Sequence, residues 1–441
     1  MRLRFLAFLL ILLSFSGKLS AIGSVAIDYE ALTYRLYAEQ KWDSLLTTGE
    51  QAINEGWDYF YIRLRTGIAA FELQRYARAA RHLEKAREFN SYDEFTISLL
   101  IKSYLYSGQP DKAKIFQKSL PSDNSKRAVN RLFSPLIYVE AGPAFSDHYN
   151  RYDQRRQTGD GLYSEAYLNK NSFYSLAGAL IPAGSSLMIN AAVSAMSFNK
   201  TRIVEITGFD SLSGNYSVRQ SEAYLSPSLI AGRKIRISPS FRLSNVRYSN
   251  PLQSDDSLVA WMIGPSGEKT YYDIAYGGEI SYLSPLWEAS VGFWSLQADQ
   301  LRYAQSSLGC IVRPYGNLNL YSHTTITLNQ NEYSRNLIFN QMIGGKLIRS
   351  IWGEILFTAG NLTGSAENNL QVFYNAFDKT KNRIAARLIY SYNDHLRLSL
   401  RTQFFLREGS ELFYPEPGVG NIYTYNYQTL SITGGLTWNL P

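Results

Sequence analysis

The sequence predicts an α plus all-β multidomain chain: a short helical array followed by a transmembrane antiparallel β-barrel of about fourteen strands. Three observations carry this prediction. Polar and apolar residues alternate from about residue 134 to the end, a period of 34 residues marks the region before it, and a short apolar leader begins the chain. We expect a signal peptide at 1–23, a helical domain at 24–122, a linker at 123–133 and the barrel at 134–441.

The alternation is clearest at the C-terminus. Leu436, Trp438 and Leu440 fall on one face of an extended segment, while Thr437 and Asn439 fall on the other. Successive side chains of a strand point to opposite sides of a sheet, so the pattern describes an apolar face backed by a polar one. More than a dozen such segments, most of roughly ten residues, match an outer-membrane barrel that is apolar toward lipid and polar toward its lumen. A secreted β-sandwich is the alternative, but at this length it would need two domains and a visible linker.

The N-terminal leader indicates where the protein is located. Arg2 and Arg4 precede an apolar run at 5–13, and small residues follow around 20–23, which is typical of a signal peptide and too short for a membrane span. The lone Cys310 excludes an intrachain disulfide. The formal net charge is +7, and three of those positive charges lie in the leader, so we expect no nucleic-acid partner. We expect the bacterial outer membrane, with lipid as a partner and the helical domain in the periplasm.

Residues 28 to 120 have helical rather than alternating apolar spacing, and they repeat every 34 residues. Leu36, Ala70 and Tyr104 line up at this spacing. The period and the small residues resemble the tetratricopeptide repeat, in which Ala or Gly lets antiparallel helices approach closely. The expected packing positions are Leu36, Ala52, Gly67, Ala70, Ala79, Ala86, Tyr104 and Ala113.

The first repeat departs from that pattern, with Leu45 at an expected small position and Gly49 inside its second helix. Three repeats are close to the minimum for a stable array, and such an array gains stability from a neighbour. Two interpretations stay open. The array is a docking module for a periplasmic protein, or a helical cap that braces the mouth of the barrel.

Counting the alternating runs gives fourteen strands, with twelve or sixteen as alternatives, and an even number fits a bacterial barrel. Tight turns are expected on one side near 182–184, 232–233, 284–285, 315–316, 346–350 and 393–394. Long loops are expected on the other side at 146–171, 201–215, 250–269, 361–381 and 408–423. The segment 370–375 is placed in an extracellular hairpin rather than in a strand of the barrel.

The same alternation assigns charged side chains to the lumen. Four arginines on two neighbouring strands form an expected basic wall: Arg383, Arg387, Arg397 and Arg401. Further inward positions are Arg236 and Arg242 and the acids Glu140, Glu222, Asp273, Glu279, Glu288 and Glu354. One interpretation is a path that selects an anionic solute or polymer. The other is a ladder of salt bridges that fills a narrow lumen, and a count of fourteen strands lies between filled and open barrels.

We find no pattern for catalysis. Only His323 among the four histidines lies in mid-strand with an inward face, and its neighbour Ser322 points to the opposite face. A Ser–His pair with an orienting partner is therefore not predicted. Metal-ligand spacing and a Gly-rich phosphate loop after a strand are missing as well. We expect neither a cofactor nor an enzyme.

The order of leader, helical repeats and C-terminal barrel resembles the outer-membrane exporters of bacterial exopolysaccharides. The resemblance covers the whole chain in architecture. It implies transport or export of a polymer or solute across the outer membrane, with a periplasmic protein docked on the repeats. The alternative is a non-conducting structural or assembly component that anchors a periplasmic complex to the outer membrane.

Overall fold

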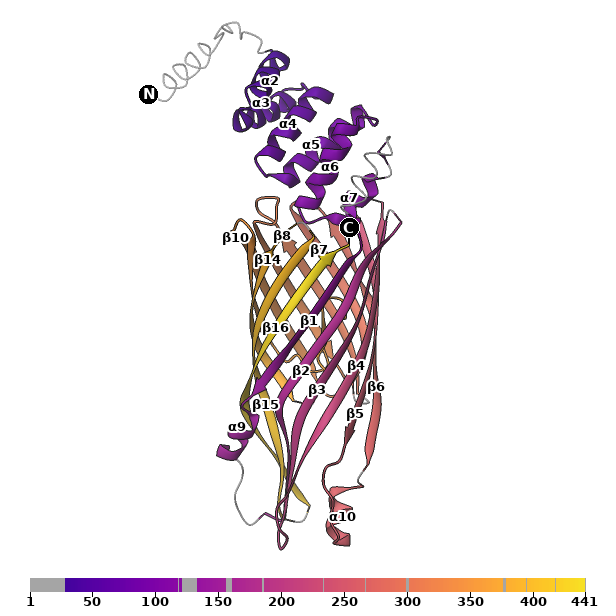
Figure 1. Cartoon of the computed structure of the whole chain (residues 1–441), viewed down its shortest axis with the longest axis vertical. Coiled ribbons are helices and arrows are strands. Elements are labelled where there is room, and N and C mark those ends of the chain that lie inside the picture. Colours follow the sequence, from indigo (N-terminus) through magenta and orange to yellow (C-terminus); the bar gives the residue numbers. More distant parts are fainter. Residues whose placement is uncertain are drawn as a thin grey trace, which may run out of the picture.

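The computed structural model describes residues 28–117, 119–120, 133–155, 161–184, 186–232, 234–265, 267–298, 301–375, 378–393, 395–416 and 418–440. The expected signal peptide lies outside these residues, as does most of the expected linker. The helical array stands on one end of a tall barrel (Figure 1). We refer to that end of the barrel as the helical end and to the opposite one as the far end.

The array consists of short helices joined by loops of three to five residues. Within the described residues before the barrel they are α2 (Tyr29–Ala38), α3 (Trp42–Asn54), α4 (Phe60–Glu72), α5 (Tyr76–Phe89), α6 (Glu94–Tyr106) and α7 (Pro110–Gln117). Helices α3, α5 and α7 begin at residues that are 34 apart, Trp42, Tyr76 and Pro110. Membership of the tetratricopeptide family stays a prediction.

The eight expected packing residues of the array are all buried. Close approach of the helices explains two glycines. A Cβ atom on Gly67 would lie 2.8 Å from the Leu83 side chain, and one on Gly49 would lie 2.1 Å from Oγ1 of Thr66. Gly49, which departs from the repeat pattern, therefore has a local reason, because it lets α3 pack against α4. Leu45 is also fully buried in the core of the array.

The remainder of the chain forms a closed antiparallel barrel of fourteen strands, as the alternation predicts. Its strands are β1 (Leu136–Ser146), β2 (Tyr163–Ala183), β3 (Leu187–Ile206), β4 (Leu212–Ala231), β5 (Ile235–Ser249), β6 (Glu268–Leu283), β7 (Trp287–Ala298), β8 (Leu301–Val312), β9 (Leu320–Gln330), β10 (Arg335–Ile348), β11 (Ile351–Ala359), β14 (Lys379–Ser391), β15 (Leu396–Glu416) and β16 (Val419–Asn439). The first and last strands close it, with Leu136 opposite Asn439. Closure pairs every strand edge.

The outer surface of the barrel carries an apolar belt. On β16, Leu430, Ile432, Leu436 and Trp438 are all exposed, although water would disfavour such a row. A closed sheet with an outward apolar band is the form in which strands cross a bilayer, since no backbone group is left unpaired in lipid. The barrel therefore belongs to the bacterial outer membrane. Among the described helices, none is long and apolar enough to span a membrane.

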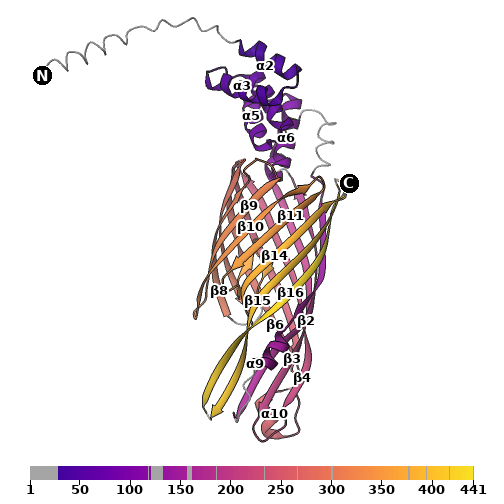
Figure 2. The same ribbon diagram turned by 90° about the vertical axis from the view of Figure 1, so that its left-hand side faces the viewer.

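The expected long loops at 201–215 and 408–423 are wrong, because strands occupy most of these residues. β3 and β4 are joined at 207–211, and β15 and β16 continue to Glu416 and from Val419. At the far end these extensions continue past the shorter strands of the barrel (Figure 2). Outside the bilayer both faces of a strand meet polar surroundings. The alternation of polar and apolar residues is therefore lost there, although the strand continues. There, β15 makes an additional pairing with β2, with Glu411 opposite Ala166.

Two of the other three expected long loops contain short helices. Helix α9 (His148–Arg155) lies between β1 and β2, and α10 (Ser257–Ile263) lies between β5 and β6. Short connections link the strands at the helical end, as the turn residues predict (Figure 1).

The helical array rests on these short turns through polar contacts. The Ala77 amide donates to the Gly316 carbonyl at 2.9 Å, and the Asn317 side chain donates to the Gln74 carbonyl at 2.9 Å. The Lys112 ammonium donates to the Leu283 carbonyl at 2.9 Å and lies over the Tyr104 ring. Burial at this junction lowers the pKa of Lys112 to about 8.

We predict that Gly67→Val destabilises the array. The new side chain collides with Leu83, and overpacking of this kind costs about 1–3 kcal/mol. The full chain in detergent should lose helical ellipticity at a lower temperature, while its barrel keeps its resistance to unfolding on unheated gels. Arg81→Val, at an exposed position of α5, is the matched control. Equal melting of the two variants would refute the close contact.

The Lys112 contact also predicts a pH dependence. Between pH 8 and 10.5 the undocked lysine binds more protons than the docked one, so the docked array gains stability as the pH rises through this window. The melting midpoint of the array should rise more from pH 7.5 to 9.5 in the natural chain than in Lys112→Met. Parallel shifts in both proteins would show that Lys112 is not desolvated at the junction.

Candidate functional site

The lumen of the barrel contains a loop of the chain itself. We define the lumen loop as residues 360–375 and 378, which connect β11 to β14. Two short strands in it, β12 (Ala366–Glu367) and β13 (Val372–Phe373), pair as a separate small sheet. Leu370 is 1% exposed, and it packs with Phe373 among lumen residues such as Trp294 and Tyr303.

The expected extracellular hairpin at 370–375 is therefore wrong, because these residues fold into the barrel. Leu362, Leu370 and Phe373 are apolar and would face water in a projecting hairpin. A barrel of this size has room for them, since its wall side chains alone fill only smaller barrels. Burial against lumen aromatic rings removes these side chains from water.

Wall side chains hold the backbone of the lumen loop. Gln305 accepts from the Ala366 amide and donates to the Ala366 carbonyl, both at 2.8 Å. Arg242 donates to the carbonyls of Leu370 and Gln371 at 3.0 and 2.6 Å. These contacts satisfy buried polar groups that would otherwise be costly.

The expected basic wall is divided by the lumen loop. Arg383 is 5% exposed and pairs with Glu367 of the loop at 2.9 Å. It also donates to Tyr374 of the loop and to Thr358 of β11. In the same dry part of the lumen, Arg242 pairs with Glu222.

The next two arginines of the wall lie in a wetter part of the lumen. Arg387 stands opposite Arg401 in the strand register, and their side chains are 32% and 28% exposed. Glu140 lies between them, 2.6 Å from Arg401 and 3.7 Å from Arg387, and Glu354 is 3.8 Å from Arg387. Arg397 lies near the start of β15 and is exposed. The four arginines thus do not form one continuous wall.

The other expected lumen charges fall into two groups. At the helical end, Arg236 contacts Glu288 of β7 and, at 3.3 Å, Asp111 of the helical array. The nearby Glu279 accepts a hydrogen bond from Ser281. Asp273 belongs to the loop contacts, since Asn375 donates to it at 2.7 Å.

A buried polar cluster at the far end is not apparent from the sequence. His148 of α9 is fully buried, stacks on the Tyr427 ring and lies 2.9 Å from the Tyr425 hydroxyl. Asp378, the last residue of the lumen loop, accepts from Tyr427 and Asn169. Burial lowers the pKa of His148 to about 4, so it is neutral at pH 7. The partners are far apart in sequence, and no local pattern brings them together.

His323 and Ser322 do not form a pair. His323 lies within reach of the Thr325 hydroxyl, and Ser322 accepts from Gln341. In the part of the chain that the structure describes, no group of three or more His, Cys, Asp or Glu could hold a metal ion.

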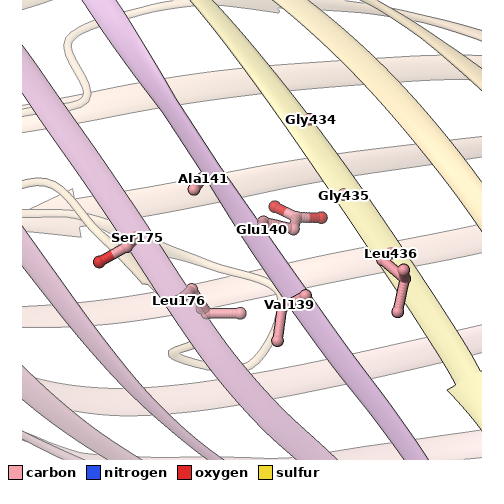
Figure 3. A pocket seen from close by; sticks show the side chains of 8 residues that line it. All are labelled: Val139, Glu140, Ala141, Ser175, Leu176, Gly434, Gly435 and Leu436. Atoms are coloured by element: carbon pink, nitrogen blue, oxygen red, sulfur yellow. The ribbon is translucent and has the colours of Figure 1, made fainter.

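A hollow of about 400 Å³ lies in the wall where β16, β1 and β2 meet. Figure 3 shows Glu140 between β1 and β16, with the side chains of Val139 and Leu436 beside one another. Small residues leave this space, namely Ala141, Ser175, Gly434 and Gly435. Its one charged group, Glu140, is already paired with Arg401.

A second hollow, of about 350 Å³, lies on the helical array. The first helix of each pair contributes to it, so it follows α2, α4 and α6. We call this surface the aromatic groove, and its lining residues are Tyr34, Tyr37, Tyr61, Leu64, Arg65, Ile68 and Phe95. The Arg65 guanidinium lies over the Tyr34 and Tyr61 rings and pairs with Glu30 at 2.7 Å.

No protein-family profile and no curated protein match this chain. Solved structures with a similar fold include the Pseudomonas putida toluene transporter TodX (TM-score 0.44, 9% identity, covering 70% of this chain and 90% of that one). A Pseudomonas aeruginosa FadL homologue has a TM-score of 0.43 at 6% identity, with 76% and 94% covered. A bacterial polysaccharide outer membrane secretin has a TM-score of 0.34 at 12% identity, with 70% and 99% covered. At these values the likenesses carry no inference about the function of this protein.

The burial contrast between arginines predicts different effects on the barrel. Arg242→Gln leaves the buried Glu222 without its arginine partner, and breaking such a pair costs about 3–5 kcal/mol. The temperature at which the folded band disappears on gels should therefore fall. Arg397→Gln, at an exposed position, should leave that temperature almost unchanged. A similar fall in both variants would contradict the packed interior around Arg242.

Proposed function

We propose that this protein is a gated outer-membrane channel that transports or exports a solute or polymer, with the helical array as a periplasmic docking module. The observation that carries the proposal is a loop of the chain that occupies the lumen and packs against its wall. Inward side chains alone fill only smaller barrels, so a wall of fourteen strands leaves space for a path. In this protein the strands of the wall leave space in the lumen, and the lumen loop, which is joined to β11 and β14, fills it.

The charges of the lumen support an anionic cargo when the loop leaves. Within the closed lumen, Glu367 balances Arg383, and the loop carbonyls of Leu370 and Gln371 engage Arg242. Withdrawal of the loop removes Glu367 and exposes Arg383 to the path. Arg387 and Arg401 lie further along that path toward the helical end, where Glu140 and Glu354 partly balance their charges. The charge of Arg383, freed from Glu367, favours anions.

The aromatic groove supports the docking role. Tyr34, Tyr61 and Phe95 are more than half exposed, and the charge of Arg65 is already balanced by Glu30. Exposed aromatic side chains around a hollow are typical of protein interaction surfaces. The groove is lined by residues of α2, α4 and α6, whereas the barrel contacts come from the turn before α5 and from the first turns of α5 and α7. A periplasmic partner could therefore bind while the array stays on the barrel.

The second candidate function is a non-conducting assembly component. The contact of Asp111 with Arg236 favours it, because it ties the array to the lumen wall. In that case the lumen loop is a permanent filler, and the array is displayed on a closed support.

Conductance in planar bilayers separates the two functions. We predict that the natural chain conducts little and that replacing 363–375 with a Gly-Ser linker gives a stable conductance with a preference for anions. Adding Arg383→Gln to the shortened chain should reduce that preference, because Arg383 loses Glu367 on deletion. Arg397→Gln in the same background serves as the control for a general loss of positive charge. A folded, shortened barrel that does not conduct would rule out the channel and leave the assembly role.

A further inference from the structure

One side chain of the lumen loop is bound from three strands at once. The Asn369 carbonyl oxygen accepts from Ser240 at 2.9 Å and from the Trp294 indole at 3.1 Å. Its amide donates to the Ser226 hydroxyl and to the Ser238 carbonyl, both at 3.0 Å. An amide has two donors and two acceptor positions, so all four are used. The partners come from β4, β5 and β7.

The backbone at this point is in a conformation that most residues avoid. Asn368, Asn369 and Leu370 have φ angles of 50°, 53° and 72°. Non-glycine residues enter this left-handed region uncommonly, and Asn tolerates it better than Leu. Three in succession persist only where surrounding contacts determine the conformation. The contacts of Asn369 and the burial of Leu370 supply that constraint.

The side chains of the wall that bind Asn369 do not need the loop to satisfy their hydrogen bonds. Ser226, Ser240 and the Trp294 indole can each bond to water or to a passing polar group once the loop has left. Release of the loop also relieves the left-handed backbone. Both effects offset the loss of the contacts of Asn369, and the seated and released states are therefore closer in free energy than the number of hydrogen bonds indicates.

We infer that Asn369 is the latch that seats the lumen loop, and that release of this latch opens the lumen while the barrel stays folded. The inference deepens the proposed channel function and rests on it for its biological meaning. The loop turns about its two attachments, and its tip leaves the contacts on β4, β5 and β7. The motion needs no change in strand pairing. Asn369 is thus a positioning residue that acts through the loop.

Two neighbouring asparagines allow a matched test. Asn369→Ala and Asn368→Ala both replace a left-handed asparagine with alanine, so both add a similar backbone cost. Only Asn369→Ala removes the four hydrogen bonds, because Asn368 is exposed. The reporter is Ala275→Cys in a Cys310→Ser background, since Ala275 is 1% exposed in the cluster that contains Leu370. The measurement is the rate at which a charged, water-soluble thiol reagent modifies it in the full chain.

With Asn369→Ala, labelling of the reporter should accelerate roughly tenfold or more, while Asn368→Ala should change it much less. Unheated gels check that both variants keep the folded barrel. If Asn369→Ala prevents folding, Ser226→Ala removes one latch partner and should give a smaller acceleration. Equal rates in the two asparagine variants, or no acceleration in any folded latch variant, would overturn the latch.

The labelling rates test the latch, and the conductance of the chain shortened at 363–375 tests the proposed channel. Conductance after shortening, without faster labelling in Asn369→Ala, would refute the latch and keep the channel. Faster labelling, without conductance after shortening, would support the latch and refute the channel.

Discussion

The structure depends on the need to fill the space inside a fourteen-stranded barrel without leaving polar groups unpaired. Closure of the sheet satisfies the backbone, but it also encloses more room than inward side chains of this size can occupy. The chain meets this need with the lumen loop, whose backbone is bound by Gln305 and Arg242. Apolar side chains of the loop lie against lumen aromatic rings. The burial and the ion pairs of each inward arginine therefore depend on how close it lies to this loop.

The same constraint distinguishes two regions of the lumen. Around Arg242 and Arg383 the loop excludes water, so each guanidinium has an acidic partner at close range. Around Arg387 and Arg401 the side chains are partly exposed, and water can screen their repulsion. The helical array contacts the rim at the helical end through the turns of β6–β7 and β8–β9. The loop that fills the lumen and the array that rests on the rim thus occupy different parts of the molecule.

The features that the sequence predicts are those that depend on contacts between residues close together in the chain. Alternation within each strand predicts the fourteen strands and the inward faces of Arg383 and Arg242, because these depend on neighbours two residues away. The 34-residue spacing likewise predicts the buried face of the array. The partners of Asn369 are more than 70 residues distant in sequence, so nothing in its neighbourhood reveals them. Alternation also gives no signal for a loop that folds inward, since its few apolar residues have no strand period.

The most direct test of the releasable loop is hydrogen exchange of its backbone amides in the folded protein. The amide of Ala366, bound to Gln305, should be protected but should open with a lower free energy than the amides of the β14–β15 pair. That result shows the loop leaving while the barrel remains closed. Protection of the loop equal to that of the barrel strands, lost only when the barrel unfolds, would contradict a gate and make the loop a permanent filling of the lumen.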